Sequence, residues 1–242
     1  MKLRFCFAVV FTTLIQLGCE EKNNDTNPAD SPYDVTIVPA NFEPGDSITG
    51  NTYFPLVVGR TMVYLGKDGS DSIRVEEIVT DSVKMILGVE CRIVNAKEYE
   101  NGDLIEDTDD WYAQDLSGNV WYFGEYSKAI KNGVVVSTGG SWESGVDGAL
   151  PGILMLAEPL VGVWYRQEYY PGEAEDVAQV LEIGESLTVP YGTFSNCLRT
   201  LEYSLLEPGA EENKIYAPGV GLLRALGTKG GSEVEDLVSI TP

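Results

Sequence analysis

Hydrophobic and polar positions alternate in short runs from Tyr53 to the end of the chain. The runs are rich in β-branched and aromatic residues, which favour strands, and none continues as a helical stripe over a dozen residues. Dipeptides that accept the positive φ values of tight hairpin turns separate the runs. These dipeptides are Asp68-Gly69, Asn101-Gly102, Gly118-Asn119, Asn132-Gly133 and Gly230-Gly231. The pattern predicts an antiparallel all-β protein.

A set of landmarks occurs twice, at a nearly constant distance along the chain. The matching pairs are Pro55 and Pro159, Cys91 and Cys197, Tyr112 and Tyr216, and Gly118 and Gly221. We interpret residues 53–126 and 157–229 as two repeats, each a meander of strands, joined by an inserted hairpin and loop over residues 127–156. One meander leaves an apolar face uncovered. We therefore expect the duplicated meander to form a sandwich or a strongly curved barrel.

The N-terminus reads as a targeting segment and is left out of the fold. Lys2 and Arg4 precede an apolar run from Phe5 to Gly18, which Cys19 ends. This arrangement resembles a bacterial lipoprotein signal, which implies removal of residues 1–18 as a signal peptide and lipidation of Cys19. An ordinary signal peptide and a single membrane anchor are the alternatives.

The segment after the signal, residues 19–52, is dominated by Asn, Asp, Pro and Glu. Such a segment buries too little apolar surface to offset the entropy of ordering it. We therefore expect a disordered tether between the lipid and an all-β domain that covers residues 53–242.

Two stretches carry a family resemblance: Tyr53–Tyr64 (YFPLVVGRTMVY) and Gly118–Glu125 (GNVWYFGE). They resemble an uncharacterised family of bacterial lipoproteins and secreted proteins, in which Y-F-P-L-x-x-G opens an aromatic strand. The resemblance implies a secreted or lipid-anchored protein and supplies no catalytic residues. A lipid anchor joined to a curved antiparallel sheet is also similar, more loosely, to the half-barrel lipoprotein carriers of the cell envelope.

Composition excludes some classes of function. The formal net charge is −22, from 38 acidic and 16 basic side chains, and histidine is absent. A surface this acidic repels phosphate backbones, so we expect no nucleic-acid partner. The absence of histidine removes the commonest general base and metal ligand, and we expect no cofactor.

The acidic run that contains Asp107 and Asp109 is a candidate calcium site, because calcium binds six to eight oxygen ligands. The spacing is not that of an EF-hand, and alternate residues of a strand face opposite ways. An acidic, solvated hairpin is the alternative interpretation.

Aromatic density suggests a ligand-binding face. The candidate residues are Trp111, Trp121, Phe123, Trp142, Trp164 and Tyr169. With period two, Trp121 and Phe123 share one face of a strand and Tyr122 takes the other. One face must belong to the core, and the other lines a cleft or stacks on sugar rings. Aromatic pairs that fill a β core are the alternative.

Cys91 and Cys197 would be the thiols left in the mature protein, in an oxidising compartment. They occupy equivalent strands of the two repeats. If a local twofold axis relates the repeats, the two residues can form a disulfide; otherwise they are separate buried thiols, since free cysteine packs as a small hydrophobe.

Taken together, these features predict a lipid-anchored binding protein of the cell envelope, extracytoplasmic and without catalytic activity. Its partner would be a small apolar ligand, a glycan or an envelope protein, and the lipid anchor would hold it at the membrane. A glycan hydrolase using carboxylates such as Glu143 and Asp147 and a purely structural envelope lipoprotein are the rival interpretations.

Overall fold

The computed structural model describes residue 28 and residues 32–45, 47–48 and 50–242. They form one 15-stranded antiparallel sheet, preceded by a 3-10 turn, η2 (Pro39–Asn41). The first seven strands are β1 (Thr61–Asp68), β2 (Asp71–Ile86), β3 (Val89–Glu100), β4 (Asp103–Gln114), β5 (Val120–Lys131), β6 (Val134–Ser137) and β7 (Trp142–Glu143). The remaining eight strands are β8 (Leu150–Met155), β9 (Trp164–Arg166), β10 (Glu168–Tyr169), β11 (Asp176–Val189), β12 (Gly192–Ser204), β13 (Glu211–Ala217), β14 (Gly221–Lys229) and β15 (Val234–Thr241). Among the described residues, no helix has the length and apolarity needed to cross a membrane.

The sheet closes almost completely into a barrel. Its strand order runs from β10 through β8, β5, β4, β3, β2, β1, β15, β14, β13, β12 and β11 to β9. The two ends of this path, β9 and β10, are consecutive in the sequence. One short segment, residues 164–169, therefore pairs with β11 through β9 and with β8 through β10. The predicted all-β class is confirmed, and the arrangement is a barrel rather than a sandwich.

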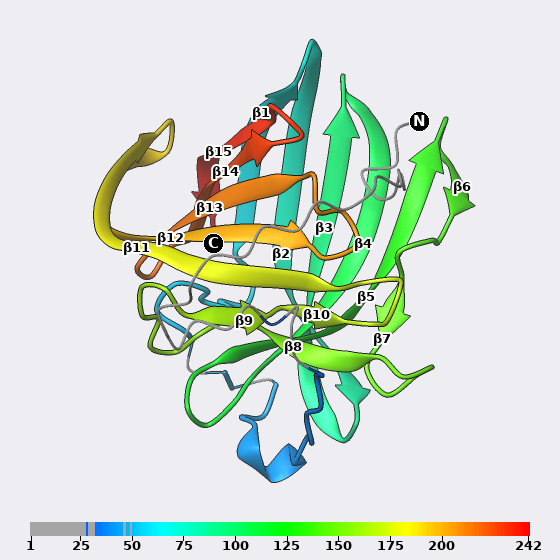
Figure 1. Cartoon of the computed structure of the whole chain (residues 1–242). Helices are drawn as coiled ribbons and strands as arrows, with labels where there is room; N and C mark the ends of the chain where they lie inside the picture. The colour runs from blue at the N-terminus through cyan, green and yellow to red at the C-terminus, as the bar shows by residue number, and fades with distance from the viewer. Residues whose placement is uncertain (1–27, 29–31, 46, 49) are drawn as a thin grey trace, which may run out of the picture.

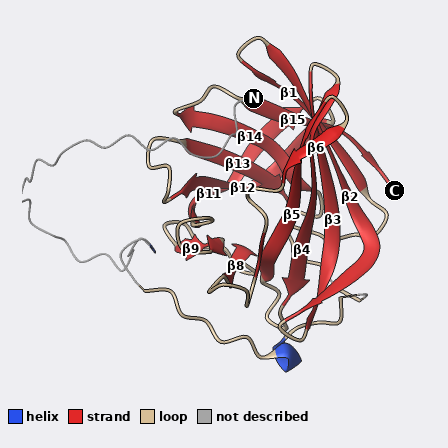
Figure 2. Cartoon of the chain, turned by 90° about the vertical axis from the view of Figure 1, so that its right-hand side faces the viewer, coloured by secondary structure: helices blue, strands red, loops and turns tan. Residues whose placement is uncertain are grey.

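The long strands of the two halves lie on opposite walls of this barrel. In Figure 1, β2, β3 and β4 run steeply up the page, and β11, β12 and β13 cross in front of them. Figure 2 shows the same walls from the side, with β8 and β9 below β11 and β12. The walls enclose the main core.

The predicted insert, residues 127–156, contributes to the barrel wall. The Asn132-Gly133 turn joins β5 to β6 in a hairpin, as expected. Beyond it, β7 and β8 also pair with β5, and β8 continues the barrel path. Part of the insert is therefore a barrel strand, because the β6 hairpin covers only one end of the β5 edge and leaves the other end open to β8.

The chain that precedes the barrel packs against its outer surface. The Tyr33 hydroxyl donates a hydrogen bond to the Pro151 carbonyl at 2.7 Å. The ring of Phe42 meets that of Phe123 edge-on, with 5.6 Å between the centroids. Residues 32–45 therefore belong to the folded structure, and the predicted disordered tether extends too far, because these aromatic side chains supply the apolar contacts. Cys19 lies outside the described residues.

The two halves enter their meanders through matching turns. The amide of Gly59 donates to the Val79 carbonyl at 2.8 Å, and the amide of Gly162 donates to the Val180 carbonyl at the same distance. Each turn leads into the strand that pairs next to β2 or β11, through β1 and β9 respectively. The duplication itself stays a prediction about the origin of the chain.

Candidate functional site

A cavity of about 120 Å³ lies inside the barrel, between the two walls. Its polar lining consists of Tyr64, Glu77, Asp110, Tyr112, Lys214 and Tyr216. Its apolar lining includes Phe54, Leu56, Met62, Val79, Val94 and Leu222. These side chains come from β1, β2, β3, β4, β13 and β14 and from the loop before β1, so the cavity depends on barrel closure.

The period-two alternation of β4 positions the polar side of the cavity. Thr108, Asp110 and Tyr112 share the inner face of this strand. On β5, Glu125 lies opposite Asp110, and Tyr122 lies opposite Tyr112. The two tyrosine rings stack, with 4.9 Å between their centroids and an interplanar angle of 24°. The stack fixes the orientation of the phenol beside the carboxyl groups.

Asp110 and Glu125 share the hydroxyl of Tyr122. The Tyr122 Oη lies 2.6 Å from Asp110 Oδ1 and 2.7 Å from Glu125 Oε2. A phenol has a single hydrogen to donate, so the second contact requires a protonated carboxyl group that donates to the phenol oxygen. Burial raises the pKa of both carboxyl groups, and the charge of Asp110 raises the pKa of Glu125 further. Glu125 is therefore the carboxyl group that holds the proton.

The opposite wall has a different arrangement, in which a lysine neutralises the acid. Lys214 Nζ lies 2.9 Å from Glu202 Oε2 and 3.6 Å from Glu212 Oε2. The Tyr216 hydroxyl donates to Glu202 Oε1 at 3.1 Å. Burial lowers the pKa of Lys214, but the carboxylates of Glu202 and Glu212 raise it more, so this pKa lies well above its usual value. Lys214 is therefore a permanent cation that already has its counter-ions.

Glu77, on β2, differs from both groups. Its carboxyl group lines the cavity, and within the described part of the chain no hydrogen bond or ion pair of that group is found. Burial raises the pKa of Glu77 to about 7, Asp110 adds to the increase and Lys214 opposes it. A carboxyl group without a hydrogen-bonding partner in such a place is costly to ionise.

The six aromatic residues predicted to bind ligand do not meet in one place. Trp111 and Phe123 are buried on the outside of the barrel wall in a cluster with Cys91, and Trp121 and Phe42 pack against it. Tyr122, which lies between Trp121 and Phe123 on β5, packs in the core inside the barrel instead. The predicted alternation along β5 is therefore confirmed. These outer aromatics fill a core beneath the N-terminal segment, as the alternative interpretation expected.

The remaining three predicted aromatics lie apart from one another. Trp142 packs edge-on against Tyr122, with 5.5 Å between the ring centroids. Trp164 contacts Tyr203 at 6.0 Å, and Tyr169 contacts Tyr33 at 5.2 Å. None of the six lines the interior cavity.

Trp111 and Trp142 share a shallow external groove of about 410 Å³. Lys84 Nζ covers the Trp111 ring, 3.3 Å from its centroid, and forms an ion pair with Glu143 at 2.7 Å. This ion pair occupies the face on which a sugar ring would stack. The geometry therefore does not favour a glycan at Trp111.

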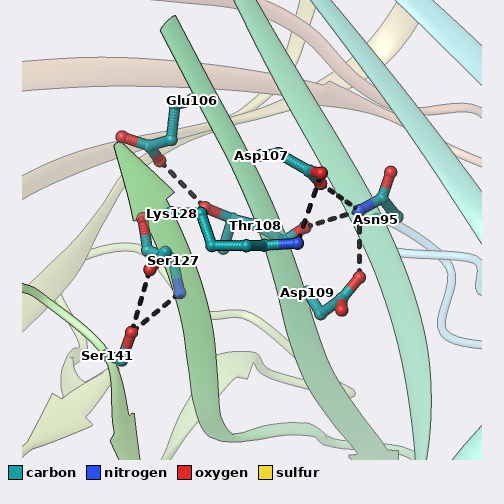
Figure 3. Close-up of polar contacts among 8 residues, drawn as sticks. All are labelled: Asn95, Glu106, Asp107, Thr108, Asp109, Ser127, Lys128 and Ser141. Carbon is teal, nitrogen blue, oxygen red and sulfur yellow. Dashed lines mark hydrogen bonds and ion pairs between the residues drawn. The ribbon is translucent and has the colours of Figure 1, made fainter. Parts of the chain in front are cut away.

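Asp107 and Asp109 lie on the outer face of β4 and are held by protein groups (Figure 3). The Asn95 side-chain amide donates to Asp107 Oδ1 at 2.8 Å and to Asp109 Oδ1 at 2.9 Å. Lys128 Nζ lies 3.2 Å from Asp107 Oδ2. Burial raises the pKa of Asp107, but the hydrogen bonds from Asn95 and Lys128 lower it more, so this pKa lies below its usual value. In the described ranges, no set of three Asp, Glu, Cys or His residues is placed to hold a metal ion.

Cys91 and Cys197 are both free, buried thiols. They pack in separate apolar clusters, Cys91 with Trp111 and Phe123 and Cys197 with Leu223. The disulfide alternative is therefore not the arrangement in this structure, because the equivalent positions on β3 and β12 do not approach each other. Burial raises the pKa of the Cys91 thiol.

Sequence reasoning missed Glu77, Asp110 and Lys214, which are the charged residues of the cavity. Charged residues in strands normally face solvent, so the pattern alone assigns them to a surface. One signal was present, since Asp110 alternates with Thr108 and Tyr112 on the face that must be inner if Trp111 is outer.

The chain was compared with known proteins. No family model matches it, and no curated protein matches it. It is similar to a solved structure described as a "putative lipoprotein" from Parabacteroides distasonis, with 14% sequence identity and a TM-score of 0.40. The similarity covers 80% of this chain and 100% of that chain.

Proposed function

We propose that this chain is a lipid-anchored binding protein of the cell envelope, and that its barrel interior holds a small ligand with an apolar body. The observation that carries the proposal is the cavity of about 120 Å³ between the two walls. An apolar cavity of about 150 Å³ can bind benzene in another protein. The cavity here therefore suits a group the size of one small ring.

The lining supports binding of a group that is apolar on one side and polar on the other. Val79, Val94 and Leu222 offer aliphatic surface, while Glu77, Asp110 and Lys214 offer charges. Binding sites for small molecules combine mainly apolar walls with a few placed polar groups that fix orientation. A core without a cavity would instead have favoured the purely structural role.

The arrangement of the carboxyl groups favours binding over hydrolysis. A glycosidase places its sugar between two carboxyl groups. Here the phenol of Tyr122 stands between Asp110 and Glu125, at 2.6 and 2.7 Å. Of the pair suggested by the sequence, Glu143 is held by Lys84 at 2.7 Å. The first arrangement therefore leaves no space between the acids for a substrate, and in the second the carboxylate of Glu143 is already bound by a cation.

The anchor is proposed from the sequence, since Cys19 lies outside the described residues. The apolar run that ends at Cys19 fits lipidation, and each methylene that an acyl chain buries in the membrane contributes about 0.8 kcal/mol to anchoring. The acidic surface disfavours contact with anionic headgroups. We therefore assign the attachment to the lipid at Cys19 and the binding to the barrel.

Binding of benzyl alcohol, a neutral single-ring probe, tests the function. We expect the wild-type protein to bind it weakly, with saturation-transfer NMR as the readout. Val94→Phe should abolish the signal, because Val94 is 5% exposed and lines the cavity. Val135→Phe on β6, where the valine is 49% exposed, should leave binding unchanged. Equal signals from the two folded variants would contradict the proposal.

A further inference from the structure

The cavity has an imbalance of charge that protein groups do not correct. Lys214 is already placed between Glu202 and Glu212, at 2.9 and 3.6 Å. Glu77 and Asp110 lie on the other wall, where Asp110 contacts the phenol of Tyr122 and the carboxyl group of Glu125. Their side of the cavity therefore carries carboxyl groups without a matched cation.

Glu77 and Asp110 project into the cavity from β2 and β4, on either side of β3. The β3 residue opposite Glu77 is Ala96, and the one opposite Asp110 is Val94. These short side chains leave space between the two acids, since alternate strands lie about 10 Å apart. A group that enters the cavity beside Val94 can therefore reach both carboxyl groups.

We propose that the ligand carries a positively charged amine, which binds against Glu77 and Asp110 while its apolar body lies against Val79, Val94 and Leu222. This inference rests on the proposed function, because it names the ligand class for the same cavity. The ammonium group offers three hydrogen-bond donors and supplies the charge that the acids lack. A metal ion is a poorer match, since the described residues provide no set of three ligands.

Amine binding exchanges a proton. Glu77 faces Tyr64 from β1, Asp110 and Tyr112 from β4, and Lys214 from β13. Burial and the charge of Asp110 raise the pKa of Glu77 to about 7, and Lys214 limits the increase. In the free protein at pH 6, the Glu77 carboxyl group is mostly protonated, and an ammonium group favours its ionised form. The amine therefore displaces about one proton at this pH.

Three single-ring probes separate the possibilities: benzylamine, benzyl alcohol and benzoate, measured by calorimetry on the full chain. At pH 8 we expect benzylamine to bind at least about tenfold more tightly than benzyl alcohol, because hydrogen bonds to charged groups are the stronger ones. At pH 6 the affinity for benzylamine should fall about tenfold, following the ionised fraction of Glu77. The affinity for benzyl alcohol should not change with pH.

Glu77→Gln tests the assigned residue, and Glu76→Gln is its control. The two glutamates are adjacent on β2 and face opposite sides of the sheet, and Glu76 pairs with Arg74 at 3.0 Å. Both substitutions remove one negative charge. We expect Glu77→Gln to weaken benzylamine binding about tenfold and to leave only the smaller pH dependence of Asp110, whose pKa burial raises to about 6, with benzyl alcohol unaffected. Glu76→Gln should behave as wild type with all three probes.

Several results would overturn the inference. If benzyl alcohol and benzylamine bind equally at pH 8, the cavity binds ligands and the amine assignment is wrong. If benzoate binds most tightly, Lys214 is the anchor and the ligand is an anion. If Glu77→Gln and Glu76→Gln bind benzylamine alike, Glu77 is not the site. If no probe binds the wild-type protein, the proposed function itself is contradicted.

Discussion

Replacing Glu77 by glutamine should stabilise the protein at pH 8. The wild-type carboxyl group has its pKa raised from 4.5 to about 7, chiefly by burial. Since the folded state holds the proton more tightly than the unfolded state, this group's contribution to stability is complete below pH 4.5 and is lost as the pH rises to about 7. Above that pH the folded protein contains an ionised carboxylate without a hydrogen-bonding partner.

The shift sets the size of the effect. Each pKa unit corresponds to about 1.4 kcal/mol, so the loss amounts to at most about 3 kcal/mol between the two pKa values. Glu77 is only half-buried, so solvent screens its charge and reduces this figure. A neutral amide has no such loss. The free energy of unfolding of Glu77→Gln should therefore exceed that of wild type by up to about 3 kcal/mol at pH 8, and by less than about 1 kcal/mol at pH 5.

Urea denaturation at the two pH values, followed by tryptophan fluorescence, measures the difference. For a domain of this size the gain at pH 8 corresponds to a rise in Tm of about 5–10 °C. Glu76→Gln is the matched control, because that glutamate is half-buried on the outer face and bonded to Arg74. A Glu77→Gln protein that is no more stable than wild type at pH 8 would refute the idea that Glu77 is desolvated in the cavity.

The other predictions concern the anchor, the thiols and the N-terminal segment. Cys19→Ser should move the protein from the membrane to the soluble fraction, or leave the precursor uncleaved, and a membrane-bound product of mature mass would contradict the lipid anchor. Thiol titration of the unreduced barrel should give two groups from Cys91 and Cys197 after unfolding, with slow reaction before it, because both are buried; a count of zero would show a disulfide. Phe42→Ala should lower the free energy of unfolding by about 2 kcal/mol, since the ring packs on Trp121 and Phe123; an unchanged urea midpoint would show that the segment is not docked.

Local features of the fold were predictable because they depend on neighbouring residues. Asn101 and Gly102 have φ values of 52° and 93°, the conformation that an Asn-Gly hairpin turn requires. Leu87 also has a positive φ, of 49°, a conformation that leucine rarely adopts, and only the following Gly88, with a φ of 81°, marks this turn in the sequence. Tertiary pairing of β2 with β3 imposes the turn there.

Closure of the barrel was not predictable from the sequence. The segment 164–169 pairs with β11 along one part and with β8 along the next. Its residues have the same alternating pattern as an ordinary strand, and a pattern does not identify the partners. The choice between sandwich and barrel depends on this pairing, so the pattern left both open.

The charged residues of the cavity were hidden for a related reason. Asp110 belongs to an acidic run in which Asp107 and Asp109 face outwards. From its composition alone, the whole run is expected to lie on one solvated surface. The register of β4 with β5 separates these residues, because it sets Asp110 opposite Glu125 and beside Tyr122. A residue-level prediction would have required that register.

The charges of the cavity also bear on the proposed duplication. If the two halves correspond as the landmarks suggest, Tyr112 matches Tyr216 and Asp110 matches Lys214, each two residues before its tyrosine. Both tyrosines and both charged residues line the same cavity. Identical halves would place two like charges there, which repel each other in a poorly solvated space. An acid on one wall and a lysine on the other avoids that repulsion and makes the two sides of the cavity chemically different, which allows a ligand to bind in one orientation.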